Sequence, residues 1–344
     1  MKKVLLRIFL GVLIVTQLVG CAKSAPAATP AGAASEKKYI IRMSYVVAEA
    51  QSTHVGAQEV FKKYVEEASG GRISVELYPN GQLYSGDRQA IEAVQLGTIE
   101  MTIPAAAVLS GFEPKFQVFD LPYLFKDKEQ AYAALDGELG TKLNELLLNQ
   151  GLVNLAYGEN GFRHVMNNIK PIHTPADLKG LKIRTMENPV QIGIFKALGA
   201  NPTPMSFGEL YTALQQKTVE GGENPVPLVY TSKFYEVQKY YSLNGHQYAP
   251  TVVLINQDYF NSLPEDLQGI VKTGAEKFRD EQRIINGKQE EEFMVQLKEN
   301  GMEINTINDE EKALFVETTN SVYDEFADVI GEELMGIAKD IRSK

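Results

Sequence analysis

Apolar positions along the chain repeat with two periods, one typical of strands and one typical of amphipathic helices. In residues 72–79, Ile73, Val75 and Leu77 alternate with other residues, which predicts a strand with one buried face. In residues 54–71 the apolar residues recur every three or four positions, which predicts a helix with one buried side. Because strands and helices alternate in this way, the pattern favours helices packed on a mostly parallel sheet.

The same two periods predict the remaining elements. Further strands are expected at residues 39–47, 98–104, 151–158, 162–167, 181–186, 201–205 and 240–257. Further helices are expected at residues 85–97, 129–150, 190–199 and 207–216. After residue 263 we expect two long amphipathic helices around a short strand at residues 301–307. This order favours an α/β fold with two lobes, a class whose ligands bind in the crevice at the strand ends.

Residues 1–20 have the features of a lipoprotein signal peptide. A basic start at residues 2–7 precedes an apolar stretch at residues 8–19, which is too short to span a membrane comfortably. The sequence LVGC that ends at Cys21 resembles a bacterial lipobox, which implies cleavage before this cysteine and its lipidation. The alternative is a plain anchor helix in which the cysteine is incidental.

A tether is expected between the lipidated cysteine and the folded domain. Residues 21–38 are rich in Ala, Pro, Gly and Ser and show no apolar period. The folded domain is therefore expected to begin near Tyr39, outside the cytoplasmic membrane and attached to it through Cys21. Since the chain contains one Cys, a disulfide framework and a cysteine-based zinc cluster are excluded.

Length and charge restrict the partners. A chain of 344 residues favours two domains over one core. The net charge of −10 argues against direct binding to nucleic acid or to an anionic membrane surface. An anionic ligand would have to be attracted by locally placed arginines, because the overall charge repels it.

The sequence gives no reason to expect an enzyme. It contains no Gly-rich dinucleotide motif, no phosphate-binding loop, no nucleophile elbow and no zinc-protease motif. The histidines never fall at metal-ligand spacing along one helix; they are His54, His164, His173 and His246. We therefore expect neither catalysis, nor a metal, nor a cofactor.

Several segments together resemble the extracytoplasmic solute-binding proteins of tripartite ATP-independent periplasmic (TRAP) transporters, the DctP family. The segments are SGDRQAIEAVQLGTIEM (85–101), FDLPYLF (119–125), DLKGLKIR (177–184), GANPTPMSFGELYTALQ (199–215), ENP (223–225) and KFYEVQKYY (233–241). They occur in the family's order, and the block between residues 177 and 241 is the most specific part. The resemblance implies a periplasmic-binding-protein-like fold. In such a fold two α/β lobes flank a central cleft, hinge strands cross between them, and a long C-terminal helix braces both.

The resemblance also implies the lobe boundaries. Lobe I is expected to comprise residues 39–161 and 250–288, and lobe II residues 162–249 and 289–344. The crossings are expected near residues 160–162 and 247–251.

Four residues match positions that hold the solute in the family. Arg184 matches the arginine that pairs with the solute carboxylate, and Asn224 matches an amide donor to the same carboxylate. Arg163 matches a second arginine, and Phe207 matches an aromatic residue that packs on the solute. Each has a structural alternative: a charge on an edge strand for Arg184, a salt bridge between lobes for Arg163, and a core position for Phe207.

Other polar residues are weaker candidates. His246 and Tyr248 are possible donors near the cleft, although each can equally be a packing residue. Asp87 is expected to cap its own helix. Sialic-acid-binding members place an acid and an arginine where this chain has Ala105 and Val108, so we do not expect a sialic acid ligand.

The sequence thus predicts a lipid-anchored, monomeric, extracytoplasmic receptor for a small organic acid that supplies the membrane subunits of a TRAP transporter. A sugar acid such as a uronate, or a C4-dicarboxylate, is the expected ligand. Two alternatives remain open at this stage. The same fold can present a ligand to a sensor kinase, and a secreted hydrolase can share a two-lobed scaffold.

Overall fold

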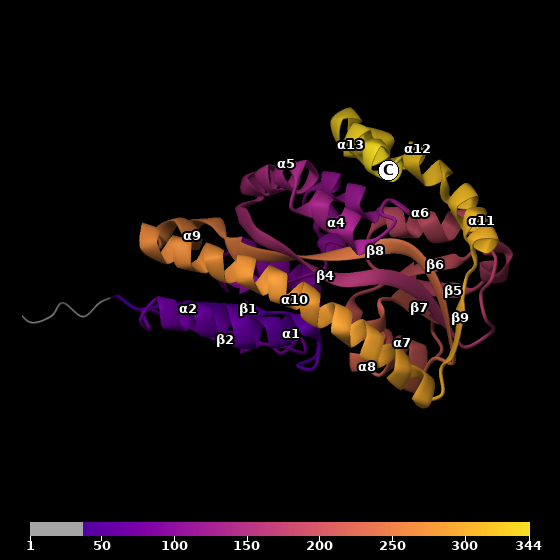
Figure 1. Cartoon of the computed structure of the whole chain (residues 1–344), viewed down its shortest axis with the longest axis horizontal. Coiled ribbons are helices and arrows are strands. Elements are labelled where there is room, and N and C mark those ends of the chain that lie inside the picture. The colour runs from indigo at the N-terminus through magenta and orange to yellow at the C-terminus, as the bar shows by residue number, and fades with distance from the viewer. Residues whose placement is uncertain (1–36) are drawn as a thin grey trace, which may run out of the picture. The chain divides into compact units, whose positions relative to one another are not determined.

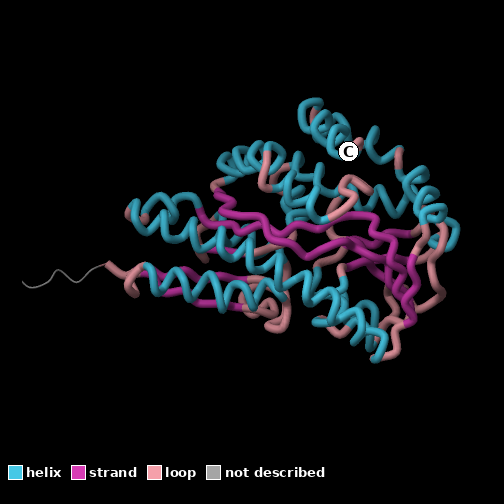
Figure 2. The backbone as a smooth tube through the Cα atoms, in the orientation of Figure 1, coloured by secondary structure: helices cyan, strands magenta, loops and turns pink. Residues whose placement is uncertain are grey.

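A mixed β-sheet with helices on both sides forms the centre of the molecule (Figures 1 and 2). The structure, a computed structural model, describes residues 37–344, which make up one compact unit, Lys37–Lys344. The predicted signal peptide, Cys21 and the tether as far as residue 36 lie outside the described residues.

In the described part of the chain the sheet has nine strands, in the order β2-β1-β3-β8-β4-β7-β5-β6, with β9 paired to β8. The strands are β1 (Tyr39–Ser44), β2 (Ile73–Tyr78), β3 (Met101–Thr102), β4 (Leu152–Asn167), β5 (Lys182–Thr185), β6 (Asn201–Pro204), β7 (Gly221–Asn224), β8 (Tyr240–Asn256) and β9 (Glu303–Thr306). Pairs at the two ends of the order are parallel, as predicted. The central pairs β3–β8, β8–β4 and β4–β7 are antiparallel, so the sheet is mixed.

The prediction of two separate strands at residues 151–158 and 162–167 was wrong, because both belong to the 16-residue strand β4. The intervening Glu-Asn-Gly sequence reads as a turn, but Gly161 has a φ of 111°, which bends the strand without ending it. The register with β8 shifts on both sides of this glycine. The predicted crossings pair with each other here, since Gly161 lies opposite Ala249.

Helices cover the sheet and the ends of its strands (Figure 1). They are α1 (Ser52–Gly56), η1 (Ala57–Lys62), α2 (Lys63–Ala68), α3 (Asp87–Gln95), η2 (Ala106–Gly111), η3 (Pro114–Asp120), α4 (Lys128–Leu135), α5 (Glu138–Leu147), η4 (Leu148–Gln150), η5 (Pro175–Leu178), α6 (Pro189–Ala197), α7 (Phe207–Gln215), α8 (Val226–Thr231), η6 (Phe234–Glu236), α9 (Gln257–Ser262), α10 (Glu265–Glu299), α11 (Asp309–Thr319), α12 (Ser321–Ile330) and α13 (Glu332–Arg342). Element η1 is a π-helix that joins α1 to α2, and the other η elements are 3-10 helices.

The 35-residue helix α10 connects two parts of the interior. Val271 and Phe278 pack in a core with residues of β1 and β2, whereas Phe293 and Leu297 pack in a core with residues of α7 and α8. The implied long brace is therefore present. The predicted lobe boundary at residues 288 and 289 falls inside this continuous helix.

The second long helix predicted near the C-terminus was wrong. The chain forms three shorter helices there, α11, α12 and α13. Gly331, with a φ of 89°, ends α12 and turns the chain into α13. Val322 and Phe326 of α12 pack in the same core as Phe116 and Phe195, so the C-terminus belongs to the main body of the fold. None of the helices in residues 37–344 combines the length and apolar character needed to cross a membrane.

Candidate functional site

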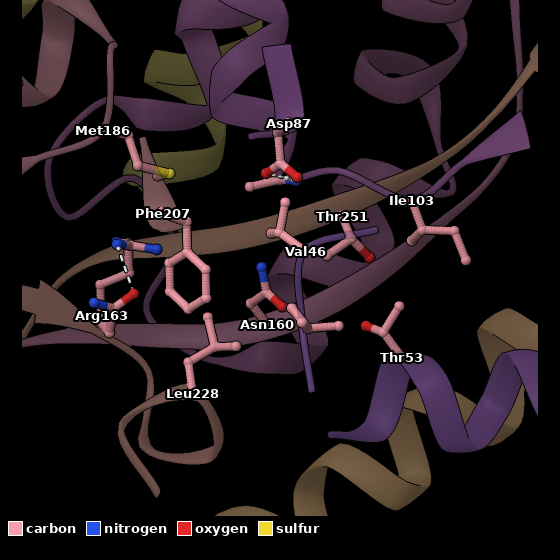
Figure 3. A pocket seen from close by; sticks show the side chains of 13 residues that line it. Val46, Thr53, Asp87, Ile103, Asn160, Arg163, Met186, Phe207, Leu228 and Thr251 are labelled. Atoms are coloured by element: carbon pink, nitrogen blue, oxygen red, sulfur yellow. Dashed lines mark hydrogen bonds between the residues drawn. The ribbon is translucent and has the colours of Figure 1, made fainter. Parts of the chain in front are cut away.

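A cavity lies beside the crossing strands β4 and β8, where α1, α3, α7 and α8 approach them (Figure 3). Its lining combines apolar and polar side chains from distant parts of the sequence: Val46, Val47, Thr53, Asp87, Ile103, Ala105, Asn160, Arg163, Met186, Phe207, Asn224, Leu228 and Thr251. A smaller neighbouring cavity is lined by Arg184 and shares Asp87, Met186 and Phe207 with the first. Because these three residues line both cavities, the two cavities form one site, with the ring of Phe207 between them.

Arg184 is buried and its charge is unpaired. Alternation along β5 places Ile183 and Arg184 on opposite faces, and both faces are covered. The guanidinium donates from Nε and Nη2 to the carbonyl of Met205, at 3.1 and 2.8 Å. Its Nη1 has no hydrogen-bond partner among the described residues, nor does any described carboxylate form an ion pair with it. Burial lowers the pKa of Arg184 to about 10.

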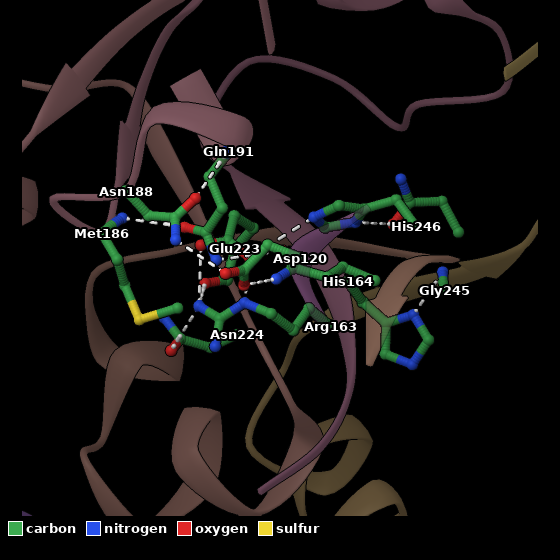
Figure 4. Close-up of polar contacts among 12 residues, drawn as sticks. Asp120, Arg163, His164, Met186, Asn188, Gln191, Glu223, Asn224, Gly245 and His246 are labelled. Atoms are coloured by element: carbon green, nitrogen blue, oxygen red, sulfur yellow. Dashed lines mark hydrogen bonds and ion pairs between the residues drawn. The ribbon is translucent and has the colours of Figure 1, made fainter. Parts of the chain in front are cut away.

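Arg163, in contrast, is neutralised by its neighbour on β7. Its Nε and Nη2 donate to the two carboxylate oxygens of Glu223, and Nη2 also donates to the backbone carbonyl of that residue (Figure 4). Burial alone would raise the pKa of Glu223, but the charge of Arg163 and the contact with His246 lower it to about 2. Arg163 lines the cavity, and its salt bridge joins two strands that were both assigned to lobe II, not two lobes.

Asn224 presents an amide donor to the cavity. It lies at the end of β7 opposite His164 of β4, and its side chain is buried. Its Oδ1 accepts a 3.3 Å hydrogen bond from Arg163, which fixes the amide with Nδ2 as its free end. In the part of the chain that the structure describes, Nδ2 has no acceptor.

Phe207 forms the wall between the two cavities. It is the first residue of α7, and the predicted capping box is present: Glu209 accepts from the backbone and the hydroxyl of Ser206, at 3.1 and 2.7 Å. The ring is half-buried and packs edge-on against Phe234, with ring centres 5.9 Å apart. Its position is therefore that of a cavity wall held by a helix start.

His246 and Tyr248 lie outside the cavity lining. The His246 ring packs edge-on against Phe195, and its Nε2 is 3.4 Å from a carboxylate oxygen of Glu223. The Tyr248 hydroxyl donates to Glu159 at 2.8 Å. Both residues are buried, so the structure gives them the packing position that the sequence left open as the alternative.

Sequence reasoning missed several residues of the lining. Thr53, Asn160 and Thr251 are neutral and belong to no recognised motif. Asp87 was expected to cap its own helix, but the cap position is Gly86, and Asp87 accepts from the backbone N–H of Ala105 at 3.2 Å. Burial raises the pKa of Asp87 to about 6.

The lining also bears on other ligands. Ala105 and Val108 contribute to the two cavities, and neither can supply the acid or the arginine that a sialic acid binder places there. Across residues 37–344 no group of three or more His, Cys, Asp or Glu side chains is arranged to hold a metal ion. The chemistry of the site is thus set by the unpaired Arg184, the Arg163–Glu223 pair, Asp87, Asn224 and the neutral polar residues around them.

Comparison with known proteins shows which family the chain is similar to. The model of the family described as "Bacterial extracellular solute-binding protein, family 7" (DctP) matches residues 43–328. A 2,3-diketo-L-gulonate-binding periplasmic protein of Escherichia coli is 38% identical over 83% of this chain and 86% of its own. A C4-dicarboxylate-binding periplasmic protein of Rhodobacter capsulatus is 36% identical over 97% and 98% of the two chains.

The chain is also similar to a protein of known structure. The sugar acid binding protein of Advenella mimigardefordensis in complex with galactonate superimposes with a TM-score of 0.87 at 36% identity, over 89% of this chain and 98% of the other.

Proposed function

Because the chain belongs to the bacterial extracellular solute-binding proteins of family 7, the DctP family of TRAP transporters, we propose that it binds a small organic acid through its carboxylate. The acid is a sugar acid or a C4-dicarboxylate, and the protein delivers it to the membrane subunits of a TRAP transporter. Relatives support both classes, since one is named for 2,3-diketo-L-gulonate and another for C4-dicarboxylates. Those names describe binding, and we propose that this chain likewise catalyses no reaction.

The observation that carries this proposal is the unpaired guanidinium of Arg184. A charge that is 1% exposed and has no carboxylate in ion-pair contact is costly, because the more distant carboxylates do not offset its lost hydration and its pKa falls. A solute carboxylate would supply that charge and could accept from Nη1 of Arg184 and from Nδ2 of Asn224, the two donors without protein acceptors. Arg163 cannot take this role alone, because Glu223 already matches its charge.

A thermal-shift measurement on the compact unit Lys37–Lys344 tests the proposal. Galactonate and succinate are compared with galactitol, a neutral polyol that lacks the carboxylate. Because a ligand that binds the folded state raises the melting temperature, we expect at least one acid to raise it and galactitol to leave it unchanged. An equal shift with galactitol, or no shift with any acid of a wider organic-acid panel, would contradict the proposal.

Membrane attachment is a separate part of the proposal. We propose that Cys21 is lipidated after removal of residues 1–20 and that the monomeric protein is thereby held at the outer face of the membrane. The Cys21→Ser variant of the full chain is expected to appear in the soluble fraction after cell fractionation. A variant that still sediments with membranes after its signal peptide has been removed would show that the lipobox interpretation is wrong.

A further inference from the structure

Four more polar atoms in the cavity lack protein partners. They are Oγ1 of Thr53, Oδ1 of Asp87, Oδ1 of Asn160 and Oγ1 of Thr251, all shielded from water and, within residues 37–344, without a hydrogen bond. All four residues line the cavity. Buried polar groups normally have partners, so a cluster of four such atoms around one space indicates groups that a ligand satisfies.

These atoms come from four separate elements. Thr53 belongs to α1, Asp87 begins α3, and Asn160 and Thr251 belong to the crossing strands β4 and β8. In Figure 3, Thr53 and Thr251 lie on one side of the cavity and Arg163 on the other, with Asn160 between them. Because Asp87 also lines the neighbouring cavity together with Arg184, we call Thr53, Asn160 and Thr251 alone the hydroxyl-binding half of the site.

The chemistry of this half differs from that around Arg184. Its members are two hydroxyls and an amide, and none is charged. A threonine hydroxyl both donates and accepts, and the free oxygen of Asn160 accepts. Sugar hydroxyls can satisfy these three atoms.

A second carboxylate on the solute would be unfavourable in the same place. It would lose its hydration, and Thr53, Asn160 and Thr251 offer it no positive charge. The other cation in the lining, Arg163, lies on the opposite side in Figure 3 and is already paired with Glu223.

We propose that the hydroxyl-binding half selects a polyhydroxylated monocarboxylate, a sugar acid, over a dicarboxylate of the same carbon length. This inference rests on the proposed function, because it assumes that Arg184 holds the shared carboxylate. The residues that determine specificity in this proposal are Thr53, Asn160 and Thr251.

Calorimetry with two matched pairs of acids tests the inference. Galactonate is compared with galactarate, and erythronate with meso-tartrate, so that each pair differs only in the group at the far end of an equally long hydroxylated chain. The pair that contains the most tightly bound of the four acids decides the test. In that pair, we expect the monocarboxylate to bind at least tenfold more tightly than the dicarboxylate. A dicarboxylate that equals or exceeds its partner in that pair would overturn the inference while leaving carboxylate binding intact. If neither these four acids nor any acid of the wider organic-acid panel binds, the proposed function itself fails.

Two variants locate the effect. Thr53→Val and Thr251→Val keep the side-chain shape but remove the hydroxyl, and each is expected to weaken the tighter monocarboxylate by about tenfold, or roughly 1.4 kcal/mol. The control is Thr141→Val, because Thr141 is exposed on α5 and should leave affinity unchanged. Unchanged affinity in both cavity variants, with unchanged melting temperatures, would overturn the assignment.

Discussion

The two buried arginines of the site differ in whether a carboxylate pairs with their charge. Arg163 and Arg184 are both about 1% exposed, yet only Arg163 has a carboxylate partner. Removing one member of a buried pair leaves the other uncompensated, whereas removing a buried charge that has no partner removes a cost. Substitution of Arg184 should therefore reduce solute affinity without reducing stability, whereas substitution of Arg163 should reduce stability.

Arg184→Met should abolish tight solute binding without lowering the melting temperature of the ligand-free protein. The loss of a charge that pairs with a desolvated carboxylate costs about 3–5 kcal/mol, which is roughly two to three and a half decades in affinity. Arg184→Lys should recover only part of this, because an ammonium lacks the two-pronged geometry of a guanidinium. Calorimetry and thermal denaturation measure both effects. Affinity within a few-fold of wild type for the methionine variant would mean that Arg184 does not hold the solute.

Arg163→Met is the matched comparison. It leaves Glu223 buried without its guanidinium partner, so we expect a clear fall in the melting temperature before any ligand is added. If both methionine variants lose the same stability, the difference between the two arginines inferred from their partners is wrong.

Asp120 should give a measurable pH dependence of stability. It is buried, accepts from Asn188 at 2.7 Å and from Gln247, and burial raises its pKa from 3.8 to about 7. Between these values the folded state holds a proton that the unfolded state has released, so the stabilisation present at low pH is lost as the pH rises to 7. Over the whole interval the loss amounts to roughly 4 kcal/mol.

The test compares urea unfolding of wild type and Asp120→Asn from pH 4 to pH 8. The variant has no carboxyl at this position, so the stability of wild type relative to the variant should fall as the pH approaches 7 and then level off. A difference that is independent of pH would show that the pKa of Asp120 is not raised.

Some residues of the site could be predicted from the sequence and others could not. Arg184 and Asn224 were predicted because each belongs to a short motif of consecutive residues. Thr53, Asn160 and Thr251 are common polar residues, and only the meeting of α1 with two distant strands gives them a shared role. The burial of His246 behind Phe195 depends on side-chain packing, which no local pattern reports.

At the scale of elements, the contact between α10 and the helical stretch formed by η1 and α2 depends on one glycine. A Cβ at Gly274 would come within 2.7 Å of Val65 and 3.3 Å of Phe61. We expect Gly274→Ala to lower the free energy of unfolding by about 1 kcal/mol or more, because overpacking outweighs the gain in helix propensity.

Gly269→Ala in the same helix is the control. No atom lies within 4 Å of a Cβ placed there, so the substitution should raise stability by about 0.5–1 kcal/mol. Urea unfolding of both variants measures the difference. Equal effects at the two positions would mean that α10 does not pack closely at Gly274.

The periods of the sequence located most strands and the longer helices, but they missed β7, α8 and α9 and did not show where elements are continuous. Gly161 reads as a turn because glycine permits positive φ, and the same property allows a bent strand when neighbouring pairs hold it. Apolar spacing also does not show where a long amphipathic stretch is divided, as in α11, α12 and α13. Strand pairing with β8 keeps β4 continuous, and packing against the core accompanies the division into three helices.

For the whole molecule, the enclosure of the site implies that it must open. Arg184, Asn224 and Thr251 are each at most 2% exposed, so a solute cannot reach them without movement of the surrounding elements. We propose that the lobes separate by hinge motion near residues 160–162 and 247–251, where a bulge and Gly161 interrupt the register. The lobes proposed are residues 39–161 with 250–288 and residues 162–249 with 289–344.

Small-angle scattering should detect this motion. The radius of gyration is expected to decrease when a saturating acid is added, because the open form is the one that admits it. An unchanged scattering profile at saturation, with binding shown by calorimetry, would contradict a hinge. The Arg184→Met variant serves as a control and should show no change with the same acid.

We propose that the unpaired charge of Arg184 also opposes closure of the protein when no solute is bound. A closed molecule without solute would bear the electrostatic cost of this guanidinium, whereas a closed molecule with a bound carboxylate would not. Membrane subunits that recognise only the closed form would then rarely bind the empty protein. Under this proposal, the same arginine that binds the solute also disfavours delivery by an unloaded protein.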